Sequence, residues 1–171
     1  MLFSSKFRLF ILVLVLVGAV GCDQTSKHIA RTELKRLGSV TLPGGFGEFR
    51  LAENPGSFLS FGDSLPKPLR MALLRVGVGL GLSGLLVYLA GSTRLTRYSF
   101  IGLALMWAGG TSNLIDRISR DGLVTDFIFI RVGPLHTGVF NAADVLIMMG
   151  LAVLVYDFWK RRHLPTDPGK V

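Results

Sequence analysis

The chain has 171 residues, 50% of them apolar, with a mean hydropathy of +0.51 and a formal net charge of +8 at pH 7. The apolar residues gather in long runs, which places the protein in a bilayer and excludes a single soluble core. The charge does not indicate a nucleic-acid partner, because the basic residues form no single stripe with interleaved aromatic residues and many flank the apolar runs. A lone cysteine, Cys22, excludes an internal disulfide.

The first apolar run lies at residues 7–26, after a basic start, and predicts a membrane span whose helix continues into residues 23–27. A second interpretation is a secretory signal, because Ala-Val-Gly-Cys at residues 19–22 resembles a bacterial lipoprotein cleavage box, which would make Cys22 a lipidated first residue. However, Ala19 stands where such a box has leucine, and three more apolar spans follow. We therefore expect an uncleaved span.

Residues 27–67 are polar, and we expect them outside the membrane. Their basic residues, beginning with Lys27, indicate the solvated end of a helix. The turn signal at residues 42–45 leads into a predicted short strand at residues 46–52, and Asn54-Pro55-Gly56 forms another turn. Pro66-Lys67-Pro68 then stands just before a helix, where proline is well tolerated.

Two further spans are predicted at residues 69–90 and 98–115. The earlier of them contains four glycines at spacings that let helices approach closely, namely Gly77, Gly79, Gly81 and Gly84. After the later span, residues 124–132 predict a strand that Gly133-Pro134 ends.

The fourth span is predicted at residues 141–159, and a basic run at residues 160–162 stops it. Basic flanks favour the cytoplasmic side, so we expect both termini and the tail at residues 160–171 to be cytoplasmic. Residues 27–67 and 117–139 are then extracytoplasmic. The predicted fold is a single integral membrane domain over residues 1–171, an all-α membrane protein with four transmembrane helices and a small extracytoplasmic β-rich portion.

Two aspartates lie in or beside strongly apolar sequence: Asp126, within the predicted strand, and Asp144, near the start of the fourth span. An ionised carboxylate in a bilayer costs about 2.5–3.5 kcal/mol on insertion scales, so such a residue is a candidate functional group. A carboxylate pair can share one proton and activate a water molecule. Without catalysis, Asp144 would be a helix-capping acid and Asp126 a strand-edge acid on a solvated loop.

The sequence resembles the lipoprotein signal peptidases, or signal peptidase II, of bacteria. The resemblance rests on five blocks that follow one another along most of the chain. They are Asp23-Gln24-Thr25-Ser26-Lys27, Asn54-Pro55-Gly56 with residues 57–61, Asn113-Leu114-Ile115-Asp116-Arg117, Gly122-Leu123-Val124-Thr125-Asp126-Phe127, and Phe140-Asn141-Ala142-Ala143-Asp144. Each block is weak alone, but all five in order, with four spans between them, are highly specific.

The resemblance implies an integral membrane aspartyl protease of the bacterial inner membrane, with its active site near the outer leaflet. Such a protease cleaves prolipoproteins just before a cysteine that carries a diacylglyceryl group. By position, the catalytic pair would be Asp126 and Asp144. The supporting or substrate-binding residues would be Asp23, Asn54, Asn113, Arg117 and Asn141.

The sequence departs from the family pattern at two positions. Ser112 stands where glycine is usual, which could alter helix packing near the site, and Phe58 stands where a small residue is usual, which could reshape an outer loop. Asp116 and Arg117 are expected to form an ion pair that supports the site.

The remaining chemistry agrees with a carboxylate site. No Ser/His/Asp or Cys/His arrangement is evident, and His28, His136 and His163 lie too far apart in the chain to suggest a metal set, so we expect no metal and no cofactor. The expected partners are prolipoprotein substrates and membrane lipid, and the protein is expected to be a monomer. The rival hypothesis is a non-enzymatic four-span membrane protein, such as a small transporter subunit, although no internal repeat supports it.

Overall fold

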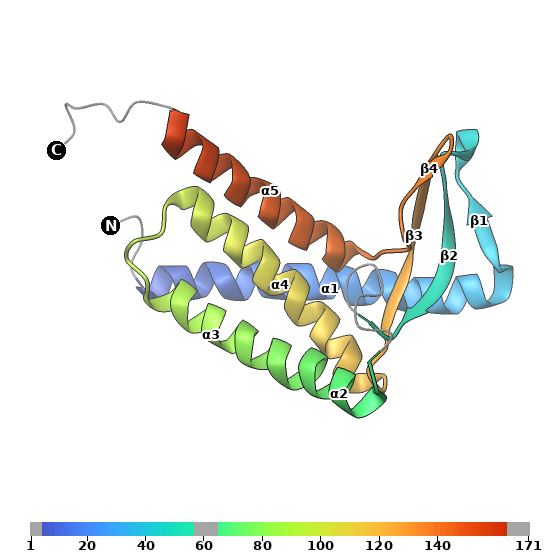
Figure 1. Ribbon diagram of the computed structural model, residues 1–171, viewed down its shortest axis with the longest axis horizontal. Helices are drawn as coiled ribbons and strands as arrows, with labels where there is room; N and C mark the ends of the chain where they lie inside the picture. The colour runs from blue at the N-terminus through green and yellow to red at the C-terminus, as the bar shows by residue number, and fades with distance from the viewer. Residues whose placement is uncertain (1–4, 57–64, 164–171) are drawn as a thin grey trace.

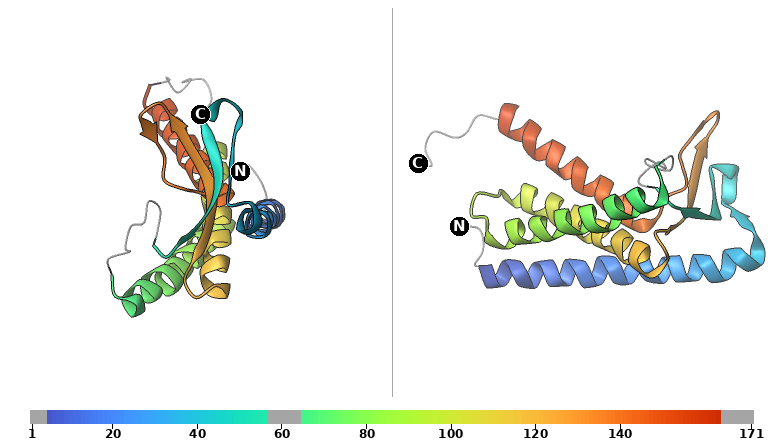
Figure 2. Two further views of the ribbon diagram at one scale, coloured as in Figure 1. Left: turned by 90° about the vertical axis from the view of Figure 1, so that its right-hand side faces the viewer. Right: turned by 60° about the horizontal axis from the view of Figure 1, so that its bottom comes forward.

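The computed structural model describes residues 5–56 and 65–163, so Phe58 and residues 164–171 lie outside the described residues. Long helices lie side by side, and a small sheet stands at one end of them (Figure 1). The helical elements are α1 (Ser5–Leu37), η1 (Pro43–Gly45), α2 (Lys67–Met71), η3 (Ala72–Gly77), α3 (Val78–Gly91), α4 (Arg97–Ser119) and α5 (Ala142–His163). The start of α1, the connection from α3 to α4 and the end of α5 lie at the end opposite the sheet, as Figures 1 and 2 show.

Among the described residues, three helical stretches are long and apolar enough to cross a membrane: Lys6–Leu37, Lys67–Gly91 and Ala142–His163. Helix α4, the predicted third span, is not among them. It is 23 residues long, but nearly half of its residues are buried within the protein, including Asn113, Asp116 and Arg117. Because it is enclosed by α1, α3 and α5, this helix needs less apolar surface than a helix that faces lipid. A fourth span therefore stays a prediction.

Helix α1 extends well beyond the predicted span, to Leu37, and its 33 residues are about 50 Å long at 1.5 Å per residue. Its last turns lie against the sheet rather than in solvent, because Ala30 and Leu34 form a small core with Phe127. Gly38, with φ of 80°, ends the helix by donating its N–H to the carbonyl of Leu34 at 2.9 Å.

The sheet has four antiparallel strands in the order β1 (Ser39–Thr41), β2 (Gly47–Asn54), β3 (Val124–Val132) and β4 (Leu135–His136), and the helices from α2 to α4 connect β2 to β3. The two predicted strands correspond to β2 and β3, so the small β-rich portion is confirmed. Strands β1 and β4 were not predicted, because three and two residues are too few to show an alternating pattern. The β2–β3 register pairs Ala52 with Asp126, which brings the end of β2 to the middle of the predicted site.

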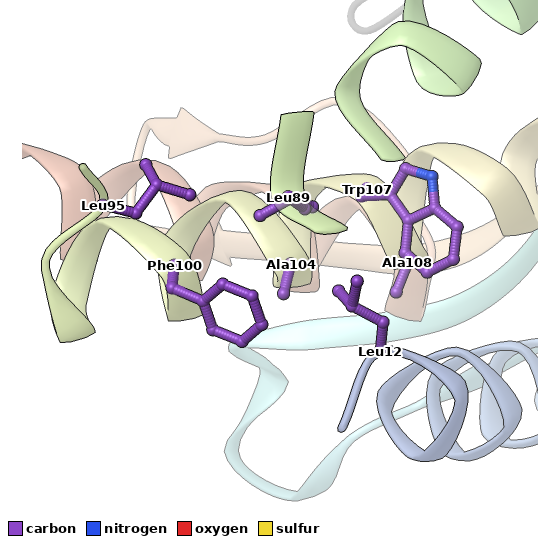
Figure 3. Packing of buried hydrophobic residues seen from close by; sticks show 7 residues of the cluster. All are labelled: Leu12, Leu89, Leu95, Phe100, Ala104, Trp107 and Ala108. Carbon is purple, nitrogen blue, oxygen red and sulfur yellow. The ribbon is translucent and has the colours of Figure 1, made fainter. Parts of the chain in front are cut away.

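The main core lies between α1, α3 and α4. Figure 3 shows its buried side chains, with Leu12 of α1 and Leu89 of α3 directed at one face of α4. The remaining members are Leu95, Phe100, Ala104, Trp107 and Ala108.

The closest helix contact is between α4 and α5, and it depends on glycines other than the predicted ones. Gly81 and Gly84 have no atom within 4 Å of the place where a Cβ would stand, so the prediction that they mediate close packing is wrong. A Cβ on Gly102 would instead lie 2.8 Å from the carbonyl oxygen of Gly150, and a Cβ on Gly109 would lie 2.5 Å from that of Ala143. Absent side chains therefore let the two backbones touch.

Candidate active site

Asp126 lies on β3, and its side chain is only 2% exposed. Two asparagine amides donate hydrogen bonds to its carboxylate. Asn54 Nδ2, from the end of β2, lies 2.9 Å from Oδ2, and Asn141 Nδ2 lies 2.6 Å from Oδ1. The β2–β3 register explains the first bond, since it aligns Asn54 beside the strand that carries Asp126.

Asp144 lies in the first turn of α5 and forms a reciprocal capping pair with Asn141. The backbone N–H of Asp144 donates to Asn141 Oδ1 at 3.0 Å, and the backbone N–H of Asn141 donates to Asp144 Oδ2 at 3.1 Å. This arrangement is the capping box that starts many helices. The expected capping role is therefore present, and it does not use the other carboxylate oxygen, Oδ1.

Two asparagines connect the aspartates. Asn113 Nδ2, from α4, donates to Asp144 Oδ1 at 2.9 Å. Asn141 Nδ2 donates both to Asp126 and to Asn113 Oδ1, the latter at 3.1 Å. Residues 126 and 144 thus belong to one continuous hydrogen-bond chain, although they come from a strand and a helix.

Two cavities meet at these carboxylates. A cavity of about 570 Å³ lies between the loop after β4 and α5, and one of about 310 Å³ lies between α3, α4 and α5. Asn54, Asp126, Asp144 and Met148 line both. An extended chain that passed from one cavity to the other would therefore cross the aspartate pair.

The pKa of Asp126 is raised to about 6, mainly by burial and also by the charge of Asp144, while the hydrogen bonds from Asn54 and Asn141 act in the opposite direction. A carboxyl group with such a pKa keeps its proton to a higher pH than an ordinary aspartic acid does. It can then donate that proton to an oxygen atom while a neighbouring carboxylate accepts another.

Behind Asn113 lies a buried charge cluster that the sequence did not reveal. Lys27 is 0% exposed, and its Nζ lies 2.7 Å from Asp23 Oδ2 and 3.1 Å from Asp116 Oδ2. It also donates to Asn113 Oδ1 at 2.9 Å. The prediction that Lys27 belongs to a solvated helix end is therefore wrong. Its spacing of four residues from Asp23 was the one available signal, because such pairs share a helix face.

Asp23 holds the start of α5 rather than facing the cavities. Its Oδ1 accepts the backbone N–H of Ala143 at 2.9 Å, and its Oδ2 accepts the hydroxyl of Ser112 at 2.7 Å. Ser112 is fully buried, and its hydroxyl adds a hydrogen bond to this cluster that the glycine usual in the family could not form.

Arg117 does not form the expected ion pair with Asp116. Asp116 bonds Lys27 and also accepts from Gln24 Nε2 at 3.0 Å and from the backbone N–H of Thr125 at 3.1 Å. Arg117 Nη2 instead donates to the carbonyl of Gly56 at 2.6 Å, which anchors the chain just after Asn54. Its buried Nε has no hydrogen-bond partner in the described part of the chain, and the side chain lines the smaller cavity.

All seven predicted site residues thus lie in one region. Asp126, Asp144, Asn113 and Asn141 form the central chain of hydrogen bonds, Asn54 and Arg117 line the cavities, and Asp23 supports α5 from behind. The sequence missed Lys27, Gln24 and Ser112 as contributors.

Comparison with known proteins gives a consistent result. The lipoprotein signal peptidase of Moorella thermoacetica is 35% identical over 147 residues, which cover 86% of this chain and 90% of that protein. The lipoprotein signal peptidase of Desulforapulum autotrophicum is 34% identical over 146 residues, covering 85% and 89%. Two solved structures, each described as a bacterial membrane enzyme, share the fold. Their TM-scores are 0.78 and 0.74, their identities are 22% and 24%, and they cover 92% and 88% of this chain and 92% and 93% of their own chains.

The family model of signal peptidase (SPase) II matches residues 7–160, which span every block of the resemblance and both aspartates. On this match and on these relatives, the chain belongs to the signal peptidase II family.

Proposed function

We propose that this protein is a membrane aspartyl endopeptidase that removes the signal peptide from diacylglyceryl-modified prolipoproteins, cleaving before the lipidated cysteine. The observation that carries the proposal is the pairing of Asp126 and Asp144 through Asn113 and Asn141 at the junction of two cavities. Membership of the signal peptidase II family, and the names of the relatives, support a protease that processes lipoproteins.

The two aspartates would share one proton. The ionised carboxylate would take a proton from a water molecule as the water attacks the scissile carbonyl carbon, and the protonated carboxyl group would donate to the carbonyl oxygen. The raised pKa of Asp126 favours the singly protonated pair. Because two close carboxyl groups titrate as a unit, the proton belongs to the pair and not to either residue.

The asparagines would keep this pair in place during the reaction. Asn54 and Asn141 each hold one oxygen of Asp126, and Asn113 holds Asp144, so neither carboxylate is free to rotate toward the other. Arg117 has a buried Nε that would bind a backbone carbonyl of a substrate in the smaller cavity. Groups fixed before the substrate arrives lower the cost of reaching the reactive geometry.

The surroundings of the pair suit a substrate that is part peptide and part lipid. At Met148 and Ala152 the larger cavity continues into an open face of α5 that extends toward Trp159. The residues of this face all lie on α5, and most are apolar. Acyl chains or an apolar signal-peptide helix would fit such a surface.

The proposed setting is the bacterial inner membrane, with both termini cytoplasmic and the aspartates near the outer leaflet. The basic flanks of the apolar runs support this orientation. The start of α1 and the end of α5 lie at the same end of the molecule, opposite the sheet (Figure 1). We propose that the protein acts as a monomer, because one chain supplies both aspartates and the three asparagines that hold them.

The test is cleavage of a synthetic prolipoprotein peptide that carries a diacylglyceryl cysteine, by Asp126→Asn and Asp144→Asn variants. Removing an acid or base from such a pair costs about 10²–10⁴-fold in rate, so each variant should lose at least 100-fold in kcat. Asp157→Asn is a matched control, because Asp157 is also a buried aspartate of α5, 13 residues beyond Asp144, about 20 Å along the helix.

The control should cleave at the rate of the unmodified protein. Folding is checked by thermal unfolding, because the NH₂ group of an asparagine at position 126 would face the NH₂ group of Asn54 or Asn141, and two donors cannot form a hydrogen bond. Turnover that persists in both folded variants would refute the assignment of the pair. Absence of cleavage by the unmodified protein would instead favour a non-enzymatic membrane protein.

A further inference from the structure

Lys27 is the one lysine with a side chain that is fully buried in the described part of the chain, and every hydrogen of its ammonium group has an acceptor. The acceptors are Asp23 Oδ2 at 2.7 Å, Asp116 Oδ2 at 3.1 Å and Asn113 Oδ1 at 2.9 Å. Two carboxylates offset the cost of burying the cation. The third acceptor is different, because it is an amide that also touches the aspartate pair.

The amide of Asn113 has two ends, and Lys27 determines which end faces the site. Its oxygen accepts from Lys27 Nζ and from Asn141 Nδ2, and its nitrogen donates to Asp144 Oδ1. An ammonium group has no lone pair, so it can never accept from an amide N–H. A rotated Asn113 would direct its NH₂ group at Lys27 and its oxygen at the carboxylate of Asp144, and both contacts would be repulsive.

We propose that Lys27 is a positioning residue for the cleavage reaction, which holds the amide of Asn113 in the one orientation that donates to Asp144. The inference rests on the proposed function of the aspartate pair. It extends to Asp126, because Asn141 Nδ2 bonds both Asn113 Oδ1 and Asp126 Oδ1. One cation on α1 thereby fixes one donor to each carboxylate from behind the site.

The competing explanation is that Lys27 only joins α1 to α4 through its ion pairs. A double-mutant cycle between Lys27→Met and Asn113→Ala separates the two roles. If Lys27 acts through Asn113, then Lys27→Met lowers kcat by about 10–100-fold, which is the typical loss when a residue that orients a functional side chain is removed. The double variant then loses no more than Asn113→Ala alone. KM should change less than threefold, because Lys27 is fully buried and lines neither of the two cavities described at the pair.

Arg8→Met is the matched control. Arg8 is another buried cation of α1, and it joins α1 to the end of α3 by donating to the carbonyl of Ser92. It lies 19 residues before Lys27, about 28 Å along the helix. Its loss should lower the unfolding temperature and leave kcat per folded molecule unchanged.

Loss of Lys27 leaves two buried carboxylates without their cation, so Lys27→Met can fail to fold. The Lys27→Met/Asp116→Asn variant removes one positive and one negative charge together, and it still lacks the donor to Asn113. The kcat of this variant is compared with that of Asp116→Asn alone, and the ratio gives the effect of losing Lys27 in a protein whose buried charges stay balanced.

Three results can follow, and each decides the matter. If the double variant loses no more kcat than Asn113→Ala alone, the positioning role is supported. If the kcat losses of Lys27→Met and Asn113→Ala multiply in the double variant, or if Lys27→Met leaves kcat unchanged, the positioning role is overturned and Lys27 only forms structural ion pairs. Asp144→Asn is assayed in parallel. If Asp144→Asn stays active, the proposed function itself fails. If Asp144→Asn is inactive but the kcat losses of the Lys27 and Asn113 variants multiply, only the positioning role fails.

Discussion

Replacing Gly150 by alanine should separate α4 from α5. A Cβ at residue 150 would lie 2.5 Å from the carbonyl oxygen of Gly102, 2.6 Å from Met106 Cγ and 3.1 Å from the backbone nitrogen of Met106. Ordinary contacts between such atoms are about 3.3–4.0 Å, so the helices must separate by about 1 Å. Two of the three atoms are backbone, which cannot rotate away.

Overpacking of this kind costs about 1–3 kcal/mol, and the contact with backbone favours the upper end. Alanine recovers about 1 kcal/mol through its higher helix propensity, so the net loss is about 2 kcal/mol. Gly81→Ala is the matched control, because nothing lies within 4 Å of the new Cβ and only the propensity gain remains. The two variants should therefore differ by about 3 kcal/mol in the free energy of unfolding.

Thermal unfolding in detergent measures the difference. At about 2–4 °C per kcal/mol for a chain of this length, Gly150→Ala should unfold about 6–12 °C below Gly81→Ala. A Gly150→Ala variant as stable as Gly81→Ala would refute the close α4–α5 contact. Gly109→Ala, with its Cβ 2.5 Å from the carbonyl of Ala143, should also lower kcat, since it moves the turn that carries Asp144.

Three further outcomes are expected. The pKa of Asp126 is raised to about 6, so the singly protonated pair loses its proton as the pH rises through 6. We therefore expect kcat/KM, measured from pH 5 to 8, to fall on the alkaline side. A flat profile would contradict a shared proton. Asn141→Ala removes a hydrogen-bond donor to Asp126 and the N-terminal cap of α5. It should lower the free energy of unfolding by about 1 kcal/mol and lower kcat by at least tenfold. A normal kcat would show that this amide does not position the pair. Thr96→Ala, which removes the cap of α4 and a hydrogen bond to Asp157, should cost about 1 kcal/mol in thermal unfolding with unchanged kcat, and a reduced kcat would show that the two ends of α4 are coupled.

The limits of helices and strands could be predicted where the local pattern is strong. The strand predicted at residues 124–132 is β3, residue for residue, because its β-branched and aromatic residues end at Gly133-Pro134. The helix after Pro66 begins at Lys67, within two residues of the predicted start. Helix α4 extends four residues past the predicted limit, to Ser119, because Asp116 and Arg117 in its last turns are buried against the protein rather than exposed to solvent.

The seven candidate site residues could be chosen from the sequence because the family blocks preserve their order and spacing. Their connections could not. A local pattern cannot show that Asn113 stands between Lys27 and Asp144, since these residues are 86 and 31 positions away from it. The same holds for Gly102 and Gly150, which look like ordinary helix glycines until two helices cross at them.

Residue types at short separations were sufficient to predict the apolar helices, the central strands and the two candidate aspartates. The burial of Lys27 beneath the site, and the two asparagines that join the aspartates, could be seen only once the chain was folded. A buried charge or amide needs a partner from another element, and that partner is distant in the sequence. The β2–β3 register and the α4–α5 crossing decide which partner that is.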